Sequence, residues 1–260
     1  MEVNLRGKSV LITGASKGIG LAIAEFMAAE GCNLHIAARD EWLLKAAAER
    51  MRKEHGVEVS IHRRDLSLTP EVEALGKACE DVDILVNNAG DIPPGTIEEI
   101  DGATWRKAWN LKVYGYVDLT RIIYRRMCAR RSGVIINIVG TAARTPNHRY
   151  IAGCMANIAL TMFTQCLGGE SMRHGVRVVA VNPGPTVPGR HLAHVKARAK
   201  RLLGDENRWP ELHAKSPAGR AGQASEIAEA VAFLASDRAR FISGVAIDVD
   251  GGHSVHRADA

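Results

Sequence analysis

Residues 9–20 read SVLITGASKGIG, and this segment decides the fold. A short β-type run, Ser9 to Thr13, leads directly into glycines at positions 14, 18 and 20 and then into a helical pattern. Glycine lets the backbone turn sharply and approach a ligand, while the first turn of a helix offers unpaired N–H groups and the positive end of its dipole. This order of strand, glycine turn and helix predicts a site for the pyrophosphate of a dinucleotide.

Short β-type runs alternate with helical segments along the rest of the chain. The predicted strands are Ser9–Thr13, Asn33–Ala37, Glu58–Arg63, Ile84–Asn87, Val134–Ile138, Arg177–Asn182 and Ala246–Val249. The predicted helices, with apolar residues at i, i+3 and i+4, are Gly20–Glu30, Asp40–Glu54, Glu71–Cys79, Thr104–Arg131, Asn157–His174 and Ala224–Ala235. Strands joined by crossover helices form a parallel sheet that is covered on both faces. We therefore predict an α/β fold, a Rossmann-like doubly wound seven-stranded parallel sheet, in a single domain over residues 1–260.

The composition narrows the class of protein. The chain is 46% hydrophobic and 24% charged, as is usual for soluble globular proteins. Its net charge of +5 comes from Lys and Arg residues spread over the predicted helices, without a nucleic-acid-binding motif, so we expect anionic small molecules and no nucleic acid. The five cysteines form no C-x-x-C pair, and we predict reduced thiols and no metal site. Without a run of 18 apolar residues or a basic-then-apolar leader, we expect a cytoplasmic protein with no membrane partner.

The end of the second predicted strand indicates which dinucleotide the turn accepts. A site for NAD carries a carboxylate there, which binds the ribose hydroxyls and repels the 2′-phosphate of NADP. Here the strand ends Ala37-Ala38-Arg39, and Lys17 adds a second positive charge inside the glycine turn. Because a guanidinium suits a phosphate, we predict NADP. NAD stays the alternative, since Asp40 is either a competing acid or a helix cap.

A second stretch, residues 135–164, reads IINIVGTAARTPNHRYIAGCMANIALTMFT. Further motifs are N-N-A-G at 87–90, N-P-G-P-T at 182–186, P-A-G-R-A-G at 217–222 and F-I-S-G-V-A-I-D-V-D-G-G at 241–252. With the glycine turn, they make the chain resemble the short-chain dehydrogenase/reductase family over nearly its whole length. In that family, hydride moves between a nicotinamide dinucleotide and a carbonyl or alcohol. The resemblance therefore implies an oxidoreductase.

The resemblance also implies which residues hold the dinucleotide: an adenine contact after the third strand, the adenosine ribose region after the fourth, and the nicotinamide carboxamide after the sixth. The full predicted set is Gly14, Ser16, Lys17, Gly18, Ile19, Gly20, Arg39, Asp65, Leu66, Asn87, Ala89, Gly90, Asn157, Pro183, Gly184 and Thr186.

The positions of the family's catalytic side chains are unusual. In the family, a strand ending N-I-x-S carries a serine, a tyrosine follows thirteen residues later, and a lysine follows four residues after the tyrosine. Here these positions hold Gly140, Gly153 and Asn157, because N-I-V-G and N-I-A-L-T-M-F-T fix one register from both ends. Tyr150 lies three residues before the tyrosine position, so we interpret it as a residue that does not correspond to the family's catalytic tyrosine. In the family, the charge of the lysine lowers the pKa of the tyrosine phenol, which is about 10 in a free phenol. The amide of Asn157, at the lysine position, carries no charge and cannot do so.

Of the family's catalytic residues, only Asn110, which relays protons through water, is predicted to remain. Besides Tyr150, three nearby residues are candidate substitutes. His148 has a suitable pKa but is predicted in a loop, where a histidine is usually exposed or structural. Cys154 is expected to pack in the core, and Thr141 is expected to face away from the site. The two glycines are expected to open space beside the nicotinamide for a larger substrate or ordered waters.

Residues 189–216 correspond to the family's substrate lid and are rich in Arg, Lys and His. An anionic substrate is one interpretation of this charge, and a solvated helix face is the other. The resemblance also implies a homotetramer or homodimer, because in the family two-fold interfaces are formed by the elements that correspond to the helices Thr104–Arg131 and Asn157–His174 and the last strand. These interfaces would cover Ile122, Ile123, Leu160 and Phe163.

Two functions remain open from the sequence. The first is an NADP(H)-dependent oxidoreductase with an atypical active site and a carbonyl or alcohol substrate. The second is a dinucleotide-binding protein with little or no dehydrogenase activity that serves as a sensor or a partner subunit.

Overall fold

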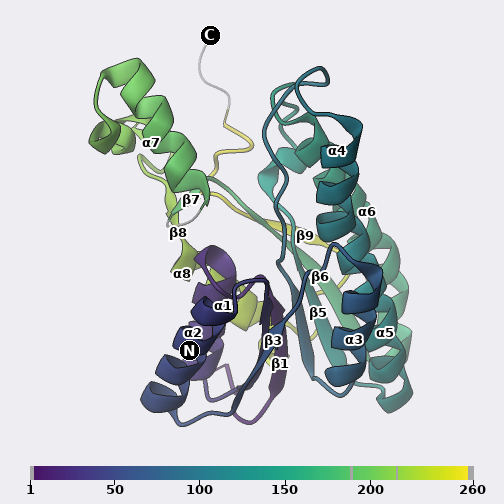
Figure 1. Cartoon of the computed structure of the whole chain (residues 1–260). Helices are drawn as coiled ribbons and strands as arrows, with labels where there is room; N and C mark the ends of the chain where they lie inside the picture. Colours follow the sequence, from purple (N-terminus) through teal and green to yellow (C-terminus); the bar gives the residue numbers. More distant parts are fainter. Residues whose placement is uncertain (1–2, 188–189, 215, 257–260) are drawn as a thin grey trace.

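The computed structural model describes residues 3–187, 190–214 and 216–256, and its main feature is a seven-stranded parallel sheet (Figure 1). The strands are β1 (Ser9–Thr13), β2 (Asn33–Ala38), β3 (Val59–Arg63), β4 (Ile84–Asn87), β5 (Gly133–Ile138), β6 (Val176–Pro183) and β9 (Ala246–Val249). Their order is β3-β2-β1-β4-β5-β6-β9, so the chain runs outward from β1 and then returns to place β4 on the other side of β1. Ligands bind at such a switch point, outside the carboxyl ends of the strands. The predicted fold class is confirmed.

Helices cover both faces of the sheet. One face carries α1 (Gly18–Ala29), α2 (Glu41–His55) and α8 (Ala224–Ala235), and the other carries α3 (Thr69–Ala78), α5 (Gly115–Arg130) and α6 (Ile151–Ser171). Alternate strand residues point to opposite faces. In β1, for example, Val10 and Ile12 pack in the first core and Leu11 packs in the second. Both faces are buried, which explains why the strands are apolar at successive positions.

Two predicted helices differ from the observed ones. The predicted helix Thr104–Arg131 consists of α4 (Gly102–Trp109), the π-helical turn η1 (Asn110–Tyr114) and α5. Helix α6 begins at Ile151 instead of Asn157, because its first turns bury only small residues, which give little periodic hydrophobic signal. The short paired strands β7 (Thr186–Val187) and β8 (Gly222–Gln223) were not predicted.

The segment predicted as a lid forms an arm that stands away from the sheet (Figure 1). Its described part contains α7 (Arg190–Leu203) and the 3-10 helix η4 (Glu206–His213). These two helices pack on each other, with Val195 and Ala199 buried. Gly189 and Lys215 of this segment lie outside the described residues.

Helix α6 packs on β6, near the β9 edge of the sheet. Together with the turn η3 (Met172–His174), it is the one helix in the described ranges that is long and apolar enough to cross a membrane. Gly168 lies against β6, where an added Cβ would be 2.5 Å from the Val178 carbonyl oxygen. This packing is that of a core helix.

The apolar residues exposed on the outer side of α6 are Met155, Ile158 and Met162. Leu160, expected at an interface, is instead fully buried in the core, as is Ile123 of α5. Ile122 and Phe163 are half-buried, so two of the four positions named from the sequence are partly exposed and two are not.

Candidate active site

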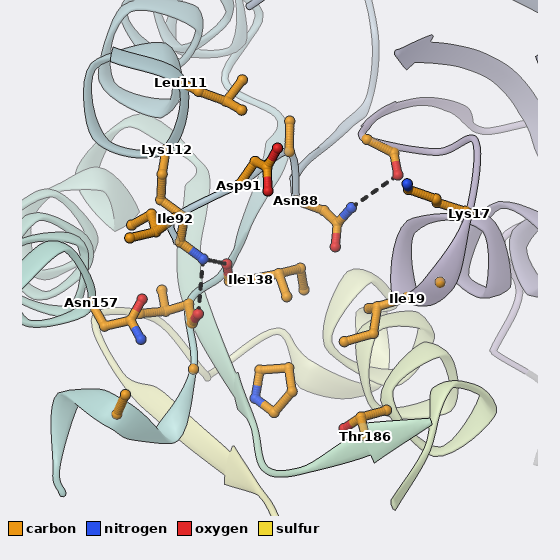
Figure 2. Close-up of a pocket in the computed structure, with 18 of the residues that line it drawn as sticks. Lys17, Ile19, Asn88, Asp91, Ile92, Leu111, Lys112, Ile138, Asn157 and Thr186 are labelled. Carbon is orange, nitrogen blue, oxygen red and sulfur yellow. Dashed lines mark hydrogen bonds between the residues drawn. The ribbon is translucent and has the colours of Figure 1, made fainter. Parts of the chain in front are cut away.

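A cavity of about 1240 Å³ lies along the carboxyl ends of the central strands (Figure 2). It is lined mainly by the segments that follow β1, β2, β4, β5 and β6, from both sides of the switch point. Its volume exceeds the range of about 300–1,000 Å³ that is typical for drug-sized ligands. The place and the size both suit a dinucleotide with a second molecule beside it.

The glycine turn after β1 forms one wall of the cavity. Gly14 and Gly18 have φ angles of +70° and +60°, which L side chains rarely adopt. A Cβ on Gly14 would lie 2.8 Å from Asn88 Nδ2, and a Cβ on Gly20 would collide with the Gly14 carbonyl. Helix α1 begins directly after this turn, with Lys17 as N-cap residue and without a side-chain cap. The geometry is that of a helix N-terminus that binds an anion.

Most of the predicted dinucleotide contacts line this cavity. Those that do are Gly14, Ser16, Lys17, Gly18, Ile19, Arg39, Leu66, Ala89, Gly90, Asn157, Pro183, Gly184 and Thr186. Gly20, Asp65 and Asn87 are not among the lining residues. Gly20 packs beneath the turn, and Asp65 accepts hydrogen bonds from the amide and the hydroxyl of Ser67 at 3.0 and 2.7 Å.

Asn87 is buried between strands, and its neighbour faces the cavity. The Asn87 side-chain amide donates to Thr120 Oγ1 at 3.0 Å and to Asn137 Oδ1 at 2.9 Å, which ties β4 to β5 and α5. Asn88 lines the cavity and donates to the carbonyls of Thr13 and Gly14 at 2.9 and 3.3 Å. Successive side chains of a strand point to opposite faces, and this alternation could have indicated that Asn88, and not Asn87, faces the cavity.

The end of the cavity beside β2 is rich in positive charge. Lys17, Arg39 and Arg64 all line it. Arg39 Nη2 lies 3.4 Å from Asp91 Oδ2 in an exposed ion pair. Asp40 caps α2, because its carboxylate accepts a hydrogen bond from the Leu43 amide at 3.1 Å. The interpretation of Asp40 as a cap is thereby confirmed.

At the other end, Gly140 and Asn157 lie side by side. An added Cβ on Gly140 would be 3.0 Å from Asn157 Nδ2, and Gly140 has a φ of +135°. Asn157 is 4% exposed, and its amide oxygen has no hydrogen-bond partner among the described residues. A buried acceptor without a partner costs about 1–3 kcal/mol. A hydroxyl group of a bound ligand would satisfy this oxygen.

The space beside Gly153 is occupied by Tyr150. Tyr150 precedes α6 as its N-cap residue, and its ring folds over the helix so that a Cβ at position 153 would collide with Tyr150 Cε1 and Cζ. Tyr150 also lines the cavity. Tyr150 is therefore not remote from the site, although the register that aligns Gly153 with the family's tyrosine is unchanged. The expectation of open space is wrong at Gly153, where the Tyr150 ring lies, whereas Gly140 lines the cavity beside the Asn157 amide.

Lys112 lies in the cavity where Asn110 was expected. Its ammonium donates to the carbonyls of Ile138 and Val139 at 3.1 and 2.9 Å, next to Gly140 (Figure 2). Asn110 lines a separate cavity of about 200 Å³. Both residues belong to η1, whose π-helical turn changes the side-chain directions that an α-helical period predicts. A lone lysine between Leu111 and Val113 was the available sequence signal.

The three other candidate substitutes differ in position. Thr141 lines the cavity, contrary to expectation, because β5 ends at Ile138 and strand alternation does not extend beyond it. His148 is exposed and does not line the cavity. Cys154 is buried, with Sγ 3.8 Å from the carbonyl oxygens of residues 145 and 147, so the prediction that it packs in the core is confirmed.

The basic arm residues whose side chains are described do not line the cavity. Arg198, Lys200 and Arg201 are exposed on α7, and Lys196 lies 3.8 Å from Glu206. Among the arm residues whose side chains are described, none belongs to the cavity lining. This arrangement favours the solvated helix face over an anionic substrate site.

Comparison with known proteins gives matches over nearly the whole chain. A family model described as Enoyl-(Acyl carrier protein) reductase matches residues 14–254. The 3-oxoacyl-[acyl-carrier-protein] reductase of Escherichia coli (strain K12) is 34% identical over 254 residues, which are 96% of this chain and 98% of that protein. L-sorbose reductase from Gluconobacter frateurii, complexed with NADPH and L-sorbose, has a TM-score of 0.92 and 32% identity, covering 99% and 100% of the chains. A solved "short chain dehydrogenase/reductase family protein" has a TM-score of 0.85 and 35% identity, covering 98% and 100%.

Proposed function

Since the chain belongs to the short-chain dehydrogenase/reductase family, we propose that it is an NADP(H)-dependent oxidoreductase that acts on a carbonyl or alcohol substrate. The observation that carries this proposal is the presence of Lys112, Tyr150 and Asn157 in one cavity. Between them they offer a positive charge, a proton donor and a hydrogen-bond acceptor. These are the chemical tasks for which the family uses other positions.

The residues present fit a nicotinamide dinucleotide. The glycine turn lines the cavity with Gly14, Ser16 and Gly18, and helix α1 begins there without a side-chain cap, which suits a pyrophosphate. The unpaired amide oxygen of Asn157 suits a ribose hydroxyl, and Pro183 and Thr186 line the cavity where the carboxamide is expected. When bound, the nicotinamide supplies or accepts the hydride.

Lys112 would stabilise negative charge at the substrate oxygen. Two backbone carbonyls hold its ammonium in place, at the end of β5 and facing the cavity. A charge that is already fixed in position costs little reorganisation when the oxygen becomes negative. Lys112 would thus supply the cation that Asn157 cannot.

Tyr150 would supply the proton. Its phenol is a hydrogen-bond donor that lines the cavity. In the reducing direction, the carbonyl carbon gains the hydride, its oxygen gains the Tyr150 proton, and the phenolate recovers a proton from water. Gly153 allows this role because any larger residue there would collide with the ring.

The preference for NADP rests on the charges beside β2. Lys17, Arg39 and Arg64 line this end of the cavity, and the Asp40 carboxylate is engaged as a helix cap. Arg39 would exchange its exposed partner Asp91 for the 2′-phosphate.

The rival function, a dinucleotide-binding sensor or partner subunit, is favoured by Gly140 and Asn157 at the family's serine and lysine positions. Two measurements distinguish these functions: the steady-state rate of NADPH oxidation with ketones, ketoses and 3-oxoacyl thioesters, and the affinity for NADPH.

We expect turnover with at least one of these three substrate classes. Tyr150→Phe should lower kcat by about 10²- to 10⁴-fold without weakening NADPH binding, while the control Tyr124→Phe, on α5 outside the cavity lining, should change neither. NADPH binding without turnover of any substrate would establish the rival.

A further inference from the structure

Three side chains with metal-binding atoms meet at the edge of the sheet, outside the dinucleotide cavity. His35 Nδ1 lies 3.1 Å from His62 Nε2, and Cys79 Sγ lies 3.5 Å from the same His62 nitrogen. All three atoms are within 4.8 Å of one another. None of the three residues lines the cavity.

The fold explains how these residues come together. In β2, Leu34 and Ile36 face the core beneath α1 and α2, so His35 points to the opposite face. His62 lies on the neighbouring edge strand β3, where it pairs with Ala37 of β2. Cys79 is the C-cap residue of α3 and is 2% exposed. The group therefore joins two strands and the end of a helix.

The distances agree with tetrahedral coordination of one ion. Zinc binds imidazole nitrogen at about 2.0–2.1 Å and thiolate sulfur at about 2.3 Å. At a tetrahedral angle, these bonds separate two nitrogens by about 3.3 Å and a nitrogen and a sulfur by about 3.6 Å. The observed separations are 3.1 and 3.5 Å. Two of the three separations therefore match those around a tetrahedral ion, and the third, between His35 Nδ1 and Cys79 Sγ, is within 4.8 Å.

We propose that His35 Nδ1, His62 Nε2 and Cys79 Sγ bind one Zn²⁺ ion, with water in the fourth position. Two imidazoles and a thiolate are ligands that zinc prefers. Binding exchanges the thiol proton of Cys79 for the metal, so one proton is released for each zinc bound.

The environment keeps the two histidines ready to bind. Burial, with smaller effects from His35 and Arg64, lowers the pKa of His62 to about 4. Burial also lowers the pKa of His35. In both histidines burial favours the neutral imidazole, which is the form that binds a metal. Burial raises the pKa of Cys79 to about 12, so its thiol stays protonated until a metal displaces the proton.

Zinc would cross-link the elements at the edge of the sheet, near the adenosine end of the cavity. It would link β3 to β2 and to the end of α3, and β3 leads directly into Arg64 and Leu66, which line the cavity. An ion that binds only the folded chain stabilises it by mass action. We therefore expect zinc to raise the melting temperature.

The test uses the full chain, treated with a chelator and then titrated with Zn²⁺ in competition with a chromophoric chelator. We expect one equivalent to bind, and Co²⁺ in its place to give a thiolate-to-cobalt charge-transfer band. Cys79→Ser and His62→Gln should each lower the affinity at least about tenfold, since each removes a ligand. The controls Cys166→Ser and His174→Gln, both at exposed positions, should bind like the unmodified chain.

Two results would overturn the site. One is the absence of stoichiometric zinc binding and of the cobalt band in the unmodified chain. The other is unchanged zinc affinity in both ligand variants. If a ligand variant does not fold, the cobalt spectrum of the unmodified chain decides alone.

Discussion

At the scale of single residues, Gly153 and Tyr150 form a matched pair. The ring of Tyr150 takes the position that a side chain at 153 would need, so the glycine is a consequence of the tyrosine's position. Placing a tyrosine at 153 and a serine at 140 would not simply restore the family's site. The first would displace the Tyr150 ring, and the second would be strained at a φ of +135°.

This pairing predicts a specific coupling. Gly153→Ala should destabilise the chain by about 1–3 kcal/mol, because the added Cβ forces the ring away. In a Tyr150→Ala chain, the same change should stabilise, since alanine favours a helix over glycine by up to about 1 kcal/mol. Urea denaturation in a double-mutant cycle measures the difference. Gly169→Ala on α6, where an added Cβ meets nothing within 4 Å, is the control. If Gly153→Ala proves as benign as Gly169→Ala, the ring does not lie over position 153.

The choice between the two dinucleotides also rests on single residues. Arg39→Asp should weaken NADPH binding about 10- to 100-fold, the equivalent of one charge-assisted hydrogen bond, and should leave NADH binding unchanged or tighter. Lys53→Asp, an exposed lysine of α2 outside the cavity lining, controls for net charge. Fluorescence titration of both dinucleotides gives the affinities. Tighter binding of NADH than of NADPH by the unmodified chain would contradict the proposed preference.

At the scale of elements, the π-helical turn η1 determines which polar residue faces the substrate. Sequence periodicity predicted a continuous helix over this turn, and the family resemblance implied that Asn110 lies in the site. The turn instead brings Lys112 into the large cavity and leaves Asn110 in the small one. A π turn has no composition signature, which is why the sequence could not locate it.

Kinetics of two variants test this assignment. Lys112→Met should lower kcat by about 10²- to 10³-fold, as the loss of one preorganised charge does, with NADPH affinity nearly unchanged. Asn110→Ala should leave kcat close to that of the unmodified chain. The reverse order, with the larger loss in Asn110→Ala, would return the proton-relay role to Asn110.

At the scale of the whole molecule, the sequence predicted the sheet well and the site only in part. Strand periods and glycine turns are local patterns, and β1, β4 and β9 match their predicted bounds. The position of the Tyr150 ring and the Asn87–Asn88 exchange depend on packing between distant segments. The meeting of His35, His62 and Cys79 depends on strand order, so spacing along the chain did not indicate it.

Assembly is the prediction that concerns the whole molecule. Met155, Ile158 and Met162 expose apolar surface on α6, and exposed apolar patches often mark interfaces. We expect a dimer or tetramer that buries them, and Ile158→Glu should yield smaller particles by light scattering. Leu202→Glu, at an exposed position on α7, should leave the mass unchanged. A monomer mass for the unmodified chain at micromolar concentration would count against the interface.

The most direct test of the account is hydride transfer itself. The chain, NADPH deuterated at the transferable C4 position, and the ketone, ketose and thioester substrates are incubated together, and the alcohol products are analysed by mass spectrometry. The account predicts an alcohol that carries deuterium on the former carbonyl carbon, formed by the unmodified chain and strongly reduced in Tyr150→Phe. Absence of labelled alcohol at stoichiometric protein, with NADPH bound, would contradict it.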